Sequence, residues 1–123
     1  MTACPCGLPA PYDACCGRLH AGAPAATAEL LMRSRYAAFA VGDPAHLLAT
    51  WHSTTRPRRL RLDRGRRWTG LQVLGRTGGG LLDATGTVRF RAQYADGGHE
   101  GGAQEEDSLF VREDGAWRYL RAT

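Results

Sequence analysis

Lysine is absent from this sequence, and all sixteen basic residues are arginine. A GC-rich genome produces the same bias, so the absence by itself indicates no function. No stretch approaches the roughly 18 consecutive apolar residues of a membrane-spanning helix. The first residues also lack the basic stretch and apolar run of a secretory signal. We therefore expect a cytoplasmic protein that does not contact membranes.

Three catalytic patterns are also missing. There is no Ser-His-Asp order, no HExxH zinc motif and no phosphate-binding loop, since no predicted helix follows the glycine run Gly78–Gly80. The chain has 123 residues, of which 43% are hydrophobic. That is the length of one domain, and it is enough to bury a core without disulfide bonds. The cysteines therefore need another explanation.

All four cysteines lie within the first sixteen residues, at Cys4, Cys6, Cys15 and Cys16. Clustered thiols in an intracellular chain more often bind metal than form disulfides, and adjacent cysteines are strained disulfide partners. Four thiolates at about 2.3 Å from one ion would close a structural zinc site, and the same donor set also suits iron. The alternatives are free or oxidised thiols, or His20 as a substitute for one sulfur ligand.

The cysteine segment resembles a known motif. Cys4-Pro-Cys-Gly7, Tyr12 and Cys15-Cys-Gly17 are similar to the SEC-C motif, the zinc-binding module at the C-terminus of the bacterial translocase motor SecA. The sequence departs from it at Leu8-Pro-Ala10, where small and basic residues are usual. Because the SEC-C module of SecA engages the chaperone SecB and ribosomes, the resemblance implies a protein or ribosome partner.

The net charge of +4 originates in one segment. Residues 56–67 hold seven arginines and one acid, Asp63, and carry +6, whereas the remaining residues together carry −2. Such a segment could neutralise phosphates and predicts nucleic-acid binding, with ribosomal RNA as the most natural acidic partner. The alternative is a solvated edge strand whose charges discourage pairing with another chain. The arginines are Arg56, Arg58, Arg59, Arg61, Arg64, Arg66 and Arg67.

Two helices are predicted in the middle of the chain. Thr27 is a suitable N-cap, good helix formers follow through Val41, and Gly42 ends the helix. The apolar positions of this helix cover a wide arc, which predicts contacts on much of its surface. Asp43 and Pro44 begin a second, short helix that runs to about residue 51.

The second half of the chain alternates with a period of two. Apolar and polar residues alternate over 60–63 and 88–94, and segments 108–112 and 116–120 flank a Glu-Asp-Gly turn. These patterns predict strands and a hairpin, whereas Gly78–Gly80 and Gly97–Gly102 are interpreted as loops. Two helices followed by about four antiparallel strands indicate an α+β fold, with helices packed on a curved sheet. The order fits a nuclear transport factor 2-like, or cystatin-like, cone over residues 23–123, with a metal-binding knuckle over residues 1–22.

A cone of this kind has a pocket at its open end, and six residues are candidates to line it. His52 could act as a general base, Glu106 could orient it or act as an acid, and Arg35 could bind an anionic group. The tryptophans would supply apolar walls. In the alternative interpretation Arg35 and Glu106 form a buried ion pair, and His52 caps a helix end. The six candidates are Arg35, Trp51, His52, Arg56, Trp68 and Glu106.

A second resemblance covers nearly the whole chain. It is carried by Leu31–Tyr36, Thr50–His52, Thr55–Pro57, Trp68–Leu71, Glu106, Ser108, Phe110, Arg112, Gly115, Trp117 and Tyr119. These residues are similar to those of bacterial YchJ-like proteins, which combine a SEC-C motif with a nuclear transport factor 2-like domain. We therefore expect a zinc-binding module that acts as an adaptor for a protein or ribosome partner. The alternative is a small-molecule enzyme of the isomerase, dehydratase or hydrolase type that uses the cone pocket.

Overall fold

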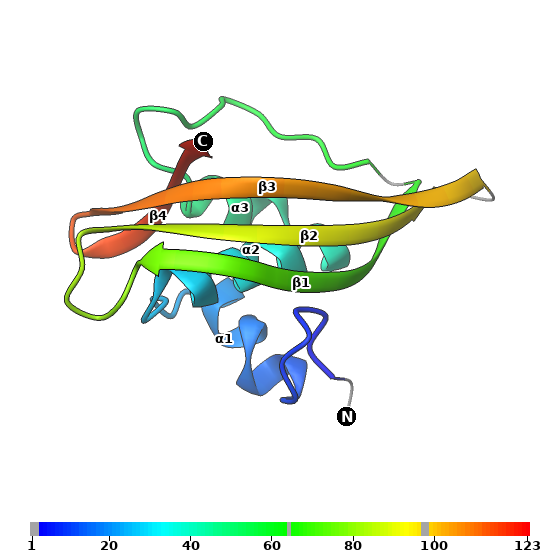
Figure 1. Ribbon diagram of the computed structural model, residues 1–123, viewed down its shortest axis with the longest axis horizontal. Helices are drawn as coiled ribbons and strands as arrows, with labels where there is room; N and C mark the ends of the chain where they lie inside the picture. Colours follow the sequence, from blue (N-terminus) through cyan, green and yellow to red (C-terminus); the bar gives the residue numbers. More distant parts are fainter. Residues whose placement is uncertain (1–2, 64, 97–98) are drawn as a thin grey trace.

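The computed structural model describes residues 3–63, 65–96 and 99–123. Four strands form one antiparallel sheet in the order β1-β2-β3-β4, and the helices precede them in the chain (Figure 1). The elements are the 3-10 turn η1 (Tyr12–Ala14), the helices α1 (Cys16–His20), α2 (Ala28–Val41) and α3 (Pro44–Ala49), and the strands β1 (Arg66–Gly78), β2 (Thr85–Asp96), β3 (His99–Glu113) and β4 (Ala116–Ala122).

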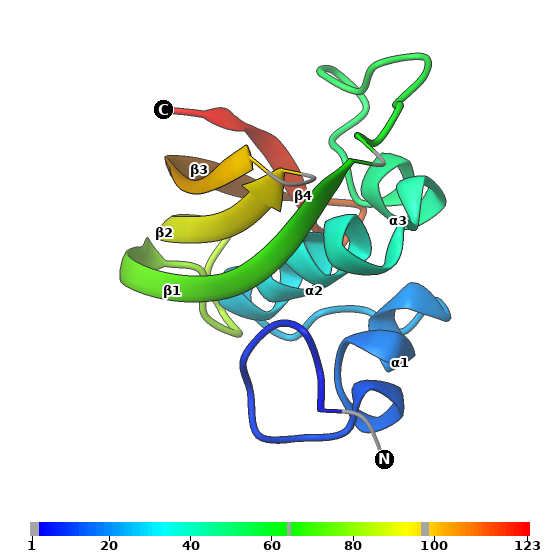
Figure 2. The same ribbon diagram turned by 90° about the vertical axis from the view of Figure 1, so that its right-hand side faces the viewer.

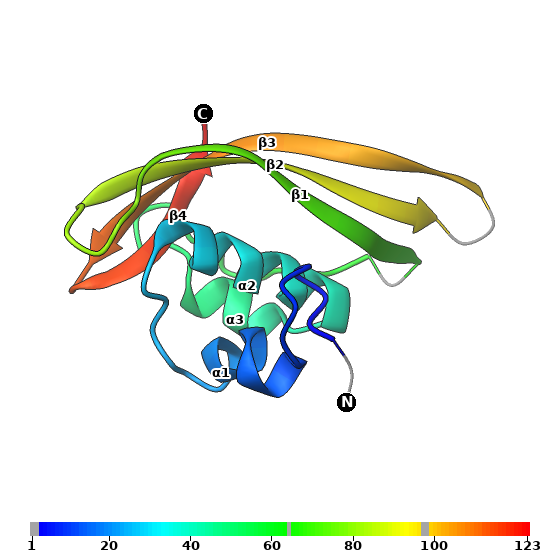
Figure 3. The ribbon, with the colours of Figure 1, turned by 60° about the horizontal axis from the view of Figure 1, so that its bottom comes forward.

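The molecule has three layers, which Figure 3 shows from the side. The curved sheet arches over α2 and α3, and the N-terminal segment with α1 lies on the opposite side of α2. The predicted α+β fold, with helices against one face of a curved antiparallel sheet, is therefore confirmed. Within the described ranges, no helix is both long and apolar enough to cross a membrane.

The ends of α2 are set by the residues that the sequence indicated. The Thr27 side chain accepts a hydrogen bond from the Leu30 N–H at 3.2 Å, and Gly42 ends the helix with a φ of 77°. Asp43 likewise accepts from the His46 N–H at 3.1 Å and begins α3, with Pro44 in its first turn. The side-chain acceptors bind backbone N–H groups that have no partner within the first turn of the helix. The left-handed conformation of Gly42 allows the chain to turn back and bond the last carbonyl groups of α2.

The buried side chains form two clusters on opposite sides of α2. The larger one joins α2 to the concave face of the sheet, and it consists of Ala28, Leu31, Met32, Val88, Phe110 and Trp117. The smaller one joins Ala37 of α2 to three cysteines of the N-terminal segment. The wide apolar arc of α2 therefore reflects contacts with two layers, as its sequence predicted.

One strand prediction and one loop prediction were wrong. Residues 60–63 form an extended connection and no strand, and the first strand begins at Arg66. In this connection Leu60 and Leu62 are half-buried against the body of the protein while Arg61 is exposed, which produces alternation without a sheet partner.

The glycine-rich stretch 97–102 was predicted as a loop, but β3 begins at residue 99; residues 97 and 98 lie outside the described residues. Gly102 pairs with Tyr94 across β2 and β3. A Cβ at Gly101 would lie 2.3 Å from the Tyr94 carbonyl oxygen. Here the glycines allow two backbones to approach closely within a sheet, and they form no loop. The predicted hairpin around Asp114 and Gly115 is confirmed, because both residues adopt positive φ angles between β3 and β4.

Candidate metal centre and cone pocket

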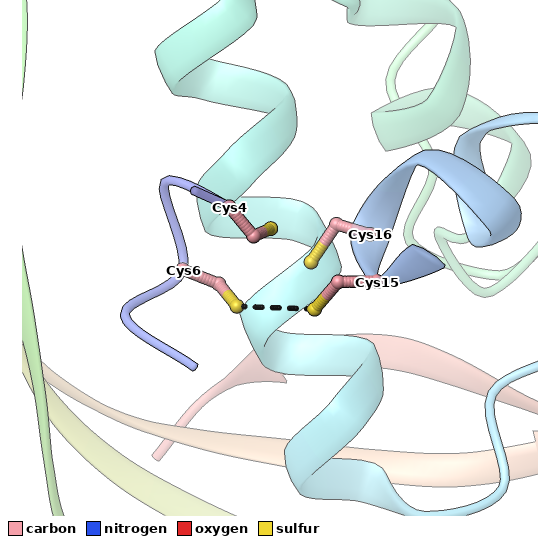
Figure 4. A group of neighbouring side chains, drawn as sticks. All are labelled: Cys4, Cys6, Cys15 and Cys16. Atoms are coloured by element: carbon pink, nitrogen blue, oxygen red, sulfur yellow. Dashed lines mark hydrogen bonds between the residues drawn. The ribbon is translucent and has the colours of Figure 1, made fainter. Parts of the chain in front are cut away.

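The four cysteines converge beside α2 from two short segments. Cys4 and Cys6 lie on a tight N-terminal turn, and Cys15 and Cys16 lie at the start of α1 (Figure 4). Gly7 follows the first pair with a φ of 91°, a conformation that favours glycine and that reverses the chain. An isolated bridge between Ala3 and Pro11 closes the turn.

The sulfur geometry fits a single tetrahedral ion. The four Sγ atoms all lie within 4.8 Å of one another, and those of Cys6 and Cys15 are 3.6 Å apart. Ligands at 2.3 Å in a tetrahedron would be about 3.8 Å apart. The sulfurs are too far apart for a disulfide, and all four cysteines are free. The cluster could therefore bind a metal ion.

The pKa values of the cysteines also favour metal binding at the cluster. A hydrogen bond from Cys16 lowers the pKa of Cys6 to about 5, against the opposing effect of burial. Burial and the proximity of Cys6 raise the pKa of Cys15 to about 11, and hydrogen bonding to Cys6 with burial raises that of Cys16. One thiolate thus suppresses ionisation of its neighbours. A cation among the sulfurs would remove this conflict, because it stabilises every thiolate that it binds.

A second layer of contacts holds the cluster on α2. Arg33 donates from Nη1 to the Cys6 carbonyl oxygen at 2.7 Å and from Nε to Glu29 at 3.1 Å. Glu29 also pairs with Arg76 of β1, and its two arginine partners lower its pKa despite burial. The turn that carries Cys6 is therefore anchored to both α2 and the sheet.

His20 lies outside the sulfur cluster, and both of its ring nitrogens have other partners. Nε2–H donates to the Ser34 carbonyl oxygen at 2.8 Å, so Nδ1 accepts from the Tyr12 hydroxyl at 2.5 Å. This bridge fixes α1 on α2. Gly17 is needed beside it, because a Cβ there would lie 2.8 Å from the Tyr12 carbonyl oxygen.

A cavity of about 340 Å³ opens between α2 and the concave face of the sheet. Four of the six pocket candidates line it, namely Arg35, Trp51, Trp68 and Glu106. Arg35 comes from α2, Trp68 from β1 and Glu106 from β3, so the cavity exists only in the folded sheet. This is the position that the cone architecture indicated.

Arg35 is 7% exposed and has no acidic partner within 4.0 Å among the described residues. Its Nη1 donates to the Leu47 carbonyl oxygen and to Thr50 Oγ1, both at 2.8 Å. The guanidinium carbon lies 5.0 Å from the Trp51 ring centre and 4.6 Å from that of Tyr119. Burial lowers the pKa of Arg35 to about 10.

The alternative of a direct ion pair between Arg35 and Glu106 does not hold in this structure. Glu106 instead accepts hydrogen bonds at one carboxylate oxygen from Ser108 and, at 3.2 Å, from the Tyr119 hydroxyl. Burial and the Glu106 charge raise the pKa of Tyr119 to about 12. Sequence reasoning did not single out Tyr119 as a pocket residue, although its alternation with Trp117 along β4 places both on the concave face.

The other two pocket candidates lie outside the cavity lining. His52 Nδ1 hydrogen-bonds Thr54 Oγ1 at 2.7 Å, and its Nε2 lies 3.8 Å from Glu113. Arg56 donates to the Trp51 carbonyl oxygen from Nε and Nη2. Both residues follow α3 on the outer connection, so neither contributes an acid, a base or an anion contact to the cavity in this arrangement.

Most of the predicted arginine segment forms the connection between α3 and β1, which projects from the body of the molecule (Figure 2). Arg58, Arg59, Arg61 and Arg67 are exposed. Arg66 is different, because it pairs with Asp96 at 3.2 Å and lies over the ring of Tyr94. Arg64 lies outside the described residues.

The comparisons with known proteins agree with this architecture. The family model of the YchJ middle NTF2-like domain matches residues 27–122. A UPF0225 protein of Streptomyces coelicolor is 56% identical over 117 residues, which are 94% of this chain and 90% of the relative. A UPF0225 protein of Corynebacterium glutamicum is 52% identical, over 94% of this chain and 92% of the relative. The chain belongs to the UPF0225 family.

Two solved structures show the UPF0225 chain's fold together with its N-terminal motif. The solution structure of a SEC-C motif containing protein from Rhodopseudomonas palustris is 32% identical, with a TM-score of 0.84 over 99% of this chain and 98% of that one. The crystal structure of a SEC-C motif containing protein from Psychrobacter arcticus is 27% identical, with a TM-score of 0.80 over 98% and 81%. The predicted family, the NTF2-like domain and the SEC-C motif are thus confirmed.

Proposed function

We propose that this UPF0225 protein is a zinc-stabilised binding module that attaches to RNA on the ribosome. In this proposal the SEC-C motif holds one structural Zn²⁺, and the arginine connection between α3 and β1 contacts phosphates. The observation that supports this most directly is the cluster of exposed arginines on a projecting connection (Figure 2). The four-sulfur site lies on the other side of the helices, and it leaves no ligand position open for catalysis.

The donor set supports zinc in a structural role. Four sulfurs complete the tetrahedron, so a bound ion would keep no site for water or substrate, as a catalytic ion needs. Cys4, Cys6 and Cys16 are buried, which protects their thiolates from solvent. Bound zinc would stabilise the folded state and cross-link the turn that carries Cys4 and Cys6 to α1. Iron has the same ligand preference, and the experiment below separates the two metals.

Metal identity is tested by elemental analysis and visible absorption of the purified protein. We expect one zinc per chain and no visible bands, since zinc has a filled d shell. Cys4→Ser/Cys6→Ser should lose the metal, and Ala14→Ser, on the exposed η1 turn, is the matched control that should retain it. Iron with strong thiolate absorption would overturn the zinc assignment, and metal-free wild type would overturn the site.

The exposed arginines support an acidic partner. Arg58, Arg59 and Arg61 have no ion-pair partner in the described ranges, whereas the paired arginines there contact Glu29, Asp96 or Glu105. Unpaired guanidinium groups on an exposed connection are free to bind phosphates. A protein partner reached through the SEC-C motif would depend less on these side chains.

Ribosome attachment is tested by co-sedimentation with bacterial ribosomes across a salt series. We expect Arg58→Gln/Arg59→Gln/Arg61→Gln to weaken binding and to flatten its logarithmic salt slope by about 0.7–0.9 per lost phosphate contact. Arg18→Gln/Arg91→Gln/Arg121→Gln removes the same charge from other exposed positions and should have a smaller effect. Salt-independent binding would instead favour a protein partner, and equal effects of the two triple variants would overturn the proposed contact.

A further inference from the structure

The cone cavity holds the buried cation Arg35, which has no acidic group within 4.0 Å among the described residues and which neither the proposed zinc site nor the proposed RNA contact uses. We propose that this cavity binds a small molecule with a flat aromatic body and one carboxylate, and that the carboxylate pairs with Arg35. The site is separate from the cysteine cluster, because the cavity lies between α2 and the sheet while the cysteines lie on the opposite side of α2.

Arg35 presents an unused hydrogen-bonding edge. Only its Nη1 has protein partners in the described part of the chain, and both are uncharged oxygens of the α3 region. Nε and Nη2 form the other fork of the guanidinium, whose geometry matches the two oxygens of a carboxylate. A charge that is 93% withdrawn from solvent, with no acid within 4.0 Å in that part of the chain, is costly unless an anion joins it.

The cavity wall beside Arg35 also contains a hydrogen-bond donor without an acceptor in the described ranges. Trp51 lines the cavity and lies 5.0 Å from the Arg35 guanidinium, and its Nε1 is buried without a hydrogen-bond partner among the described residues. A buried N–H without an acceptor is rare in native proteins. Two neighbouring side chains that line the cavity therefore each carry a donor group without an acceptor in the described part of the chain.

The charge of the ligand is limited by Glu106. Its carboxylate faces the same cavity and is held there by Ser108 and Tyr119. Arg66 also lines the cavity but already pairs with Asp96. The exposed residues Arg61 and Asp63 also border the cavity and carry opposite charges. Away from them, the buried Arg35 faces the half-buried Glu106, which suits a monoanion, whereas Glu106 and Asp63 would both repel a phosphate dianion.

The rest of the wall defines the body of the ligand. Aromatic rings from α2 and all four strands surround the cavity, and several meet edge to face, such as Tyr36 with Trp68 at 6.1 Å between ring centres. A volume of about 340 Å³ is near the lower end for ligand pockets, so the occupant is small. Leu60 and Leu62 also contribute to the lining, together with the exposed Arg61 between them. A flat ring with an attached carboxylate meets these requirements.

The proposal is tested with three probes, benzoate, cinnamate and indole-3-acetate, each beside its uncharged amide. Binding to the full chain is followed by calorimetry, with tryptophan fluorescence as a second signal for the non-indole pairs. We expect at least one acid to bind in the millimolar range or tighter, and its amide to bind roughly tenfold more weakly or worse, because the amide leaves the Arg35 charge unpaired. Equal binding of acid and amide, or no binding of any acid at millimolar concentration, would overturn the proposal.

Two variants locate the binding. Ala92→Leu fills the cavity from β2 and should abolish acid binding, whereas Ala95→Leu makes the same change on β2 outside the lining and should bind like wild type. Arg35→Gln should bind the acid and its amide with equal affinity. Because Arg35 also anchors α3, this variant is interpreted only if it folds. Ala92→Leu remains decisive in either case, since wild-type binding by that variant would place the probe elsewhere.

Discussion

At the scale of single residues, His46 links α3 to α2 in its neutral form. Its Nε2–H donates to Ser34 Oγ at 2.9 Å, and that hydroxyl donates onward to the Leu31 carbonyl oxygen. The ring lies 4.5 Å from that of His20, which itself bridges α1 and α2. Burial lowers the pKa of His46 from 6.5 to about 4, and the cationic neighbours Arg35 and Arg118 act in the same direction.

This shift predicts a loss of stability in acid. Because the folded pKa lies below the unfolded value, the contribution is complete above pH 6.5 and is lost as the pH falls towards 4. We expect wild type to lose on the order of 2 kcal/mol more than His46→Gln over this interval, measured by urea unfolding. Comparison with the variant removes the effects of carboxylates and of metal release, which both proteins share. Parallel pH profiles would contradict the prediction.

The site residues differ in how far sequence could locate them. The four cysteines lie within one short stretch, so their spacing alone predicted that the sulfurs meet. Arg35 and Glu106 are 71 positions apart, and their relation depends on sheet register and on Tyr119, whose hydroxyl donates to Glu106 and whose ring faces the Arg35 guanidinium. His52 follows a helix end in the sequence whether it acts as a catalytic base or as a structural residue, so the sequence does not separate the two roles. In the structure its contact with Glu113 shows that the side chain lies away from the cavity.

At the scale of elements, local signals predicted α2, α3 and the strands β2, β3 and β4, but not β1. Thr27 and Gly42 fix α2 through contacts within a few residues. Strand β1 was missed, because register shifts between Trp68 and Gly70 and between Val73 and Gly75 interrupt the alternation along it. Such bulges depend on the partner strand, so a single strand sequence does not reveal them.

The turn between β1 and β2 gives a prediction at this scale. A Cβ at Gly86 would lie 2.5 Å from the Cα and N atoms of Gly79, which are backbone atoms that cannot move aside separately. We expect Gly86→Ala to destabilise the protein by about 2–3 kcal/mol in urea unfolding. Gly75→Ala on β1 is the control, since nothing lies within 4 Å of its added Cβ, and it should change stability by less than about 1 kcal/mol. Equal effects of the two substitutions would show that the close approach at Gly79 is relaxed in solution.

At the scale of the whole molecule, α2 is shared by two packing units. The sheet side of the helix is buried by Val88, Phe110 and Trp117, and the opposite side is covered by the cysteine segment through Ala37. The family match begins at residue 27, after the cysteines. The sheet cluster contains no cysteine, so its packing does not require the metal centre.

This separation predicts that metal removal unfolds one unit and spares the other. On chelation, or in Cys4→Ser/Cys6→Ser, we expect residues 3–20 to lose hydrogen-exchange protection, while β2 and β3 keep theirs. The Tm should fall, because the sulfur cluster no longer cross-links its turn to α1, and α1 is then held on α2 only through the His20 bridge and the packing around Ala37 in the described residues. Ala14→Ser carries no such change and should exchange like wild type before chelation. Loss of protection across the sheet together with the N-terminal segment would show that the cysteine cluster is part of a single cooperative core, with Ala37 and its neighbours transmitting the loss through α2.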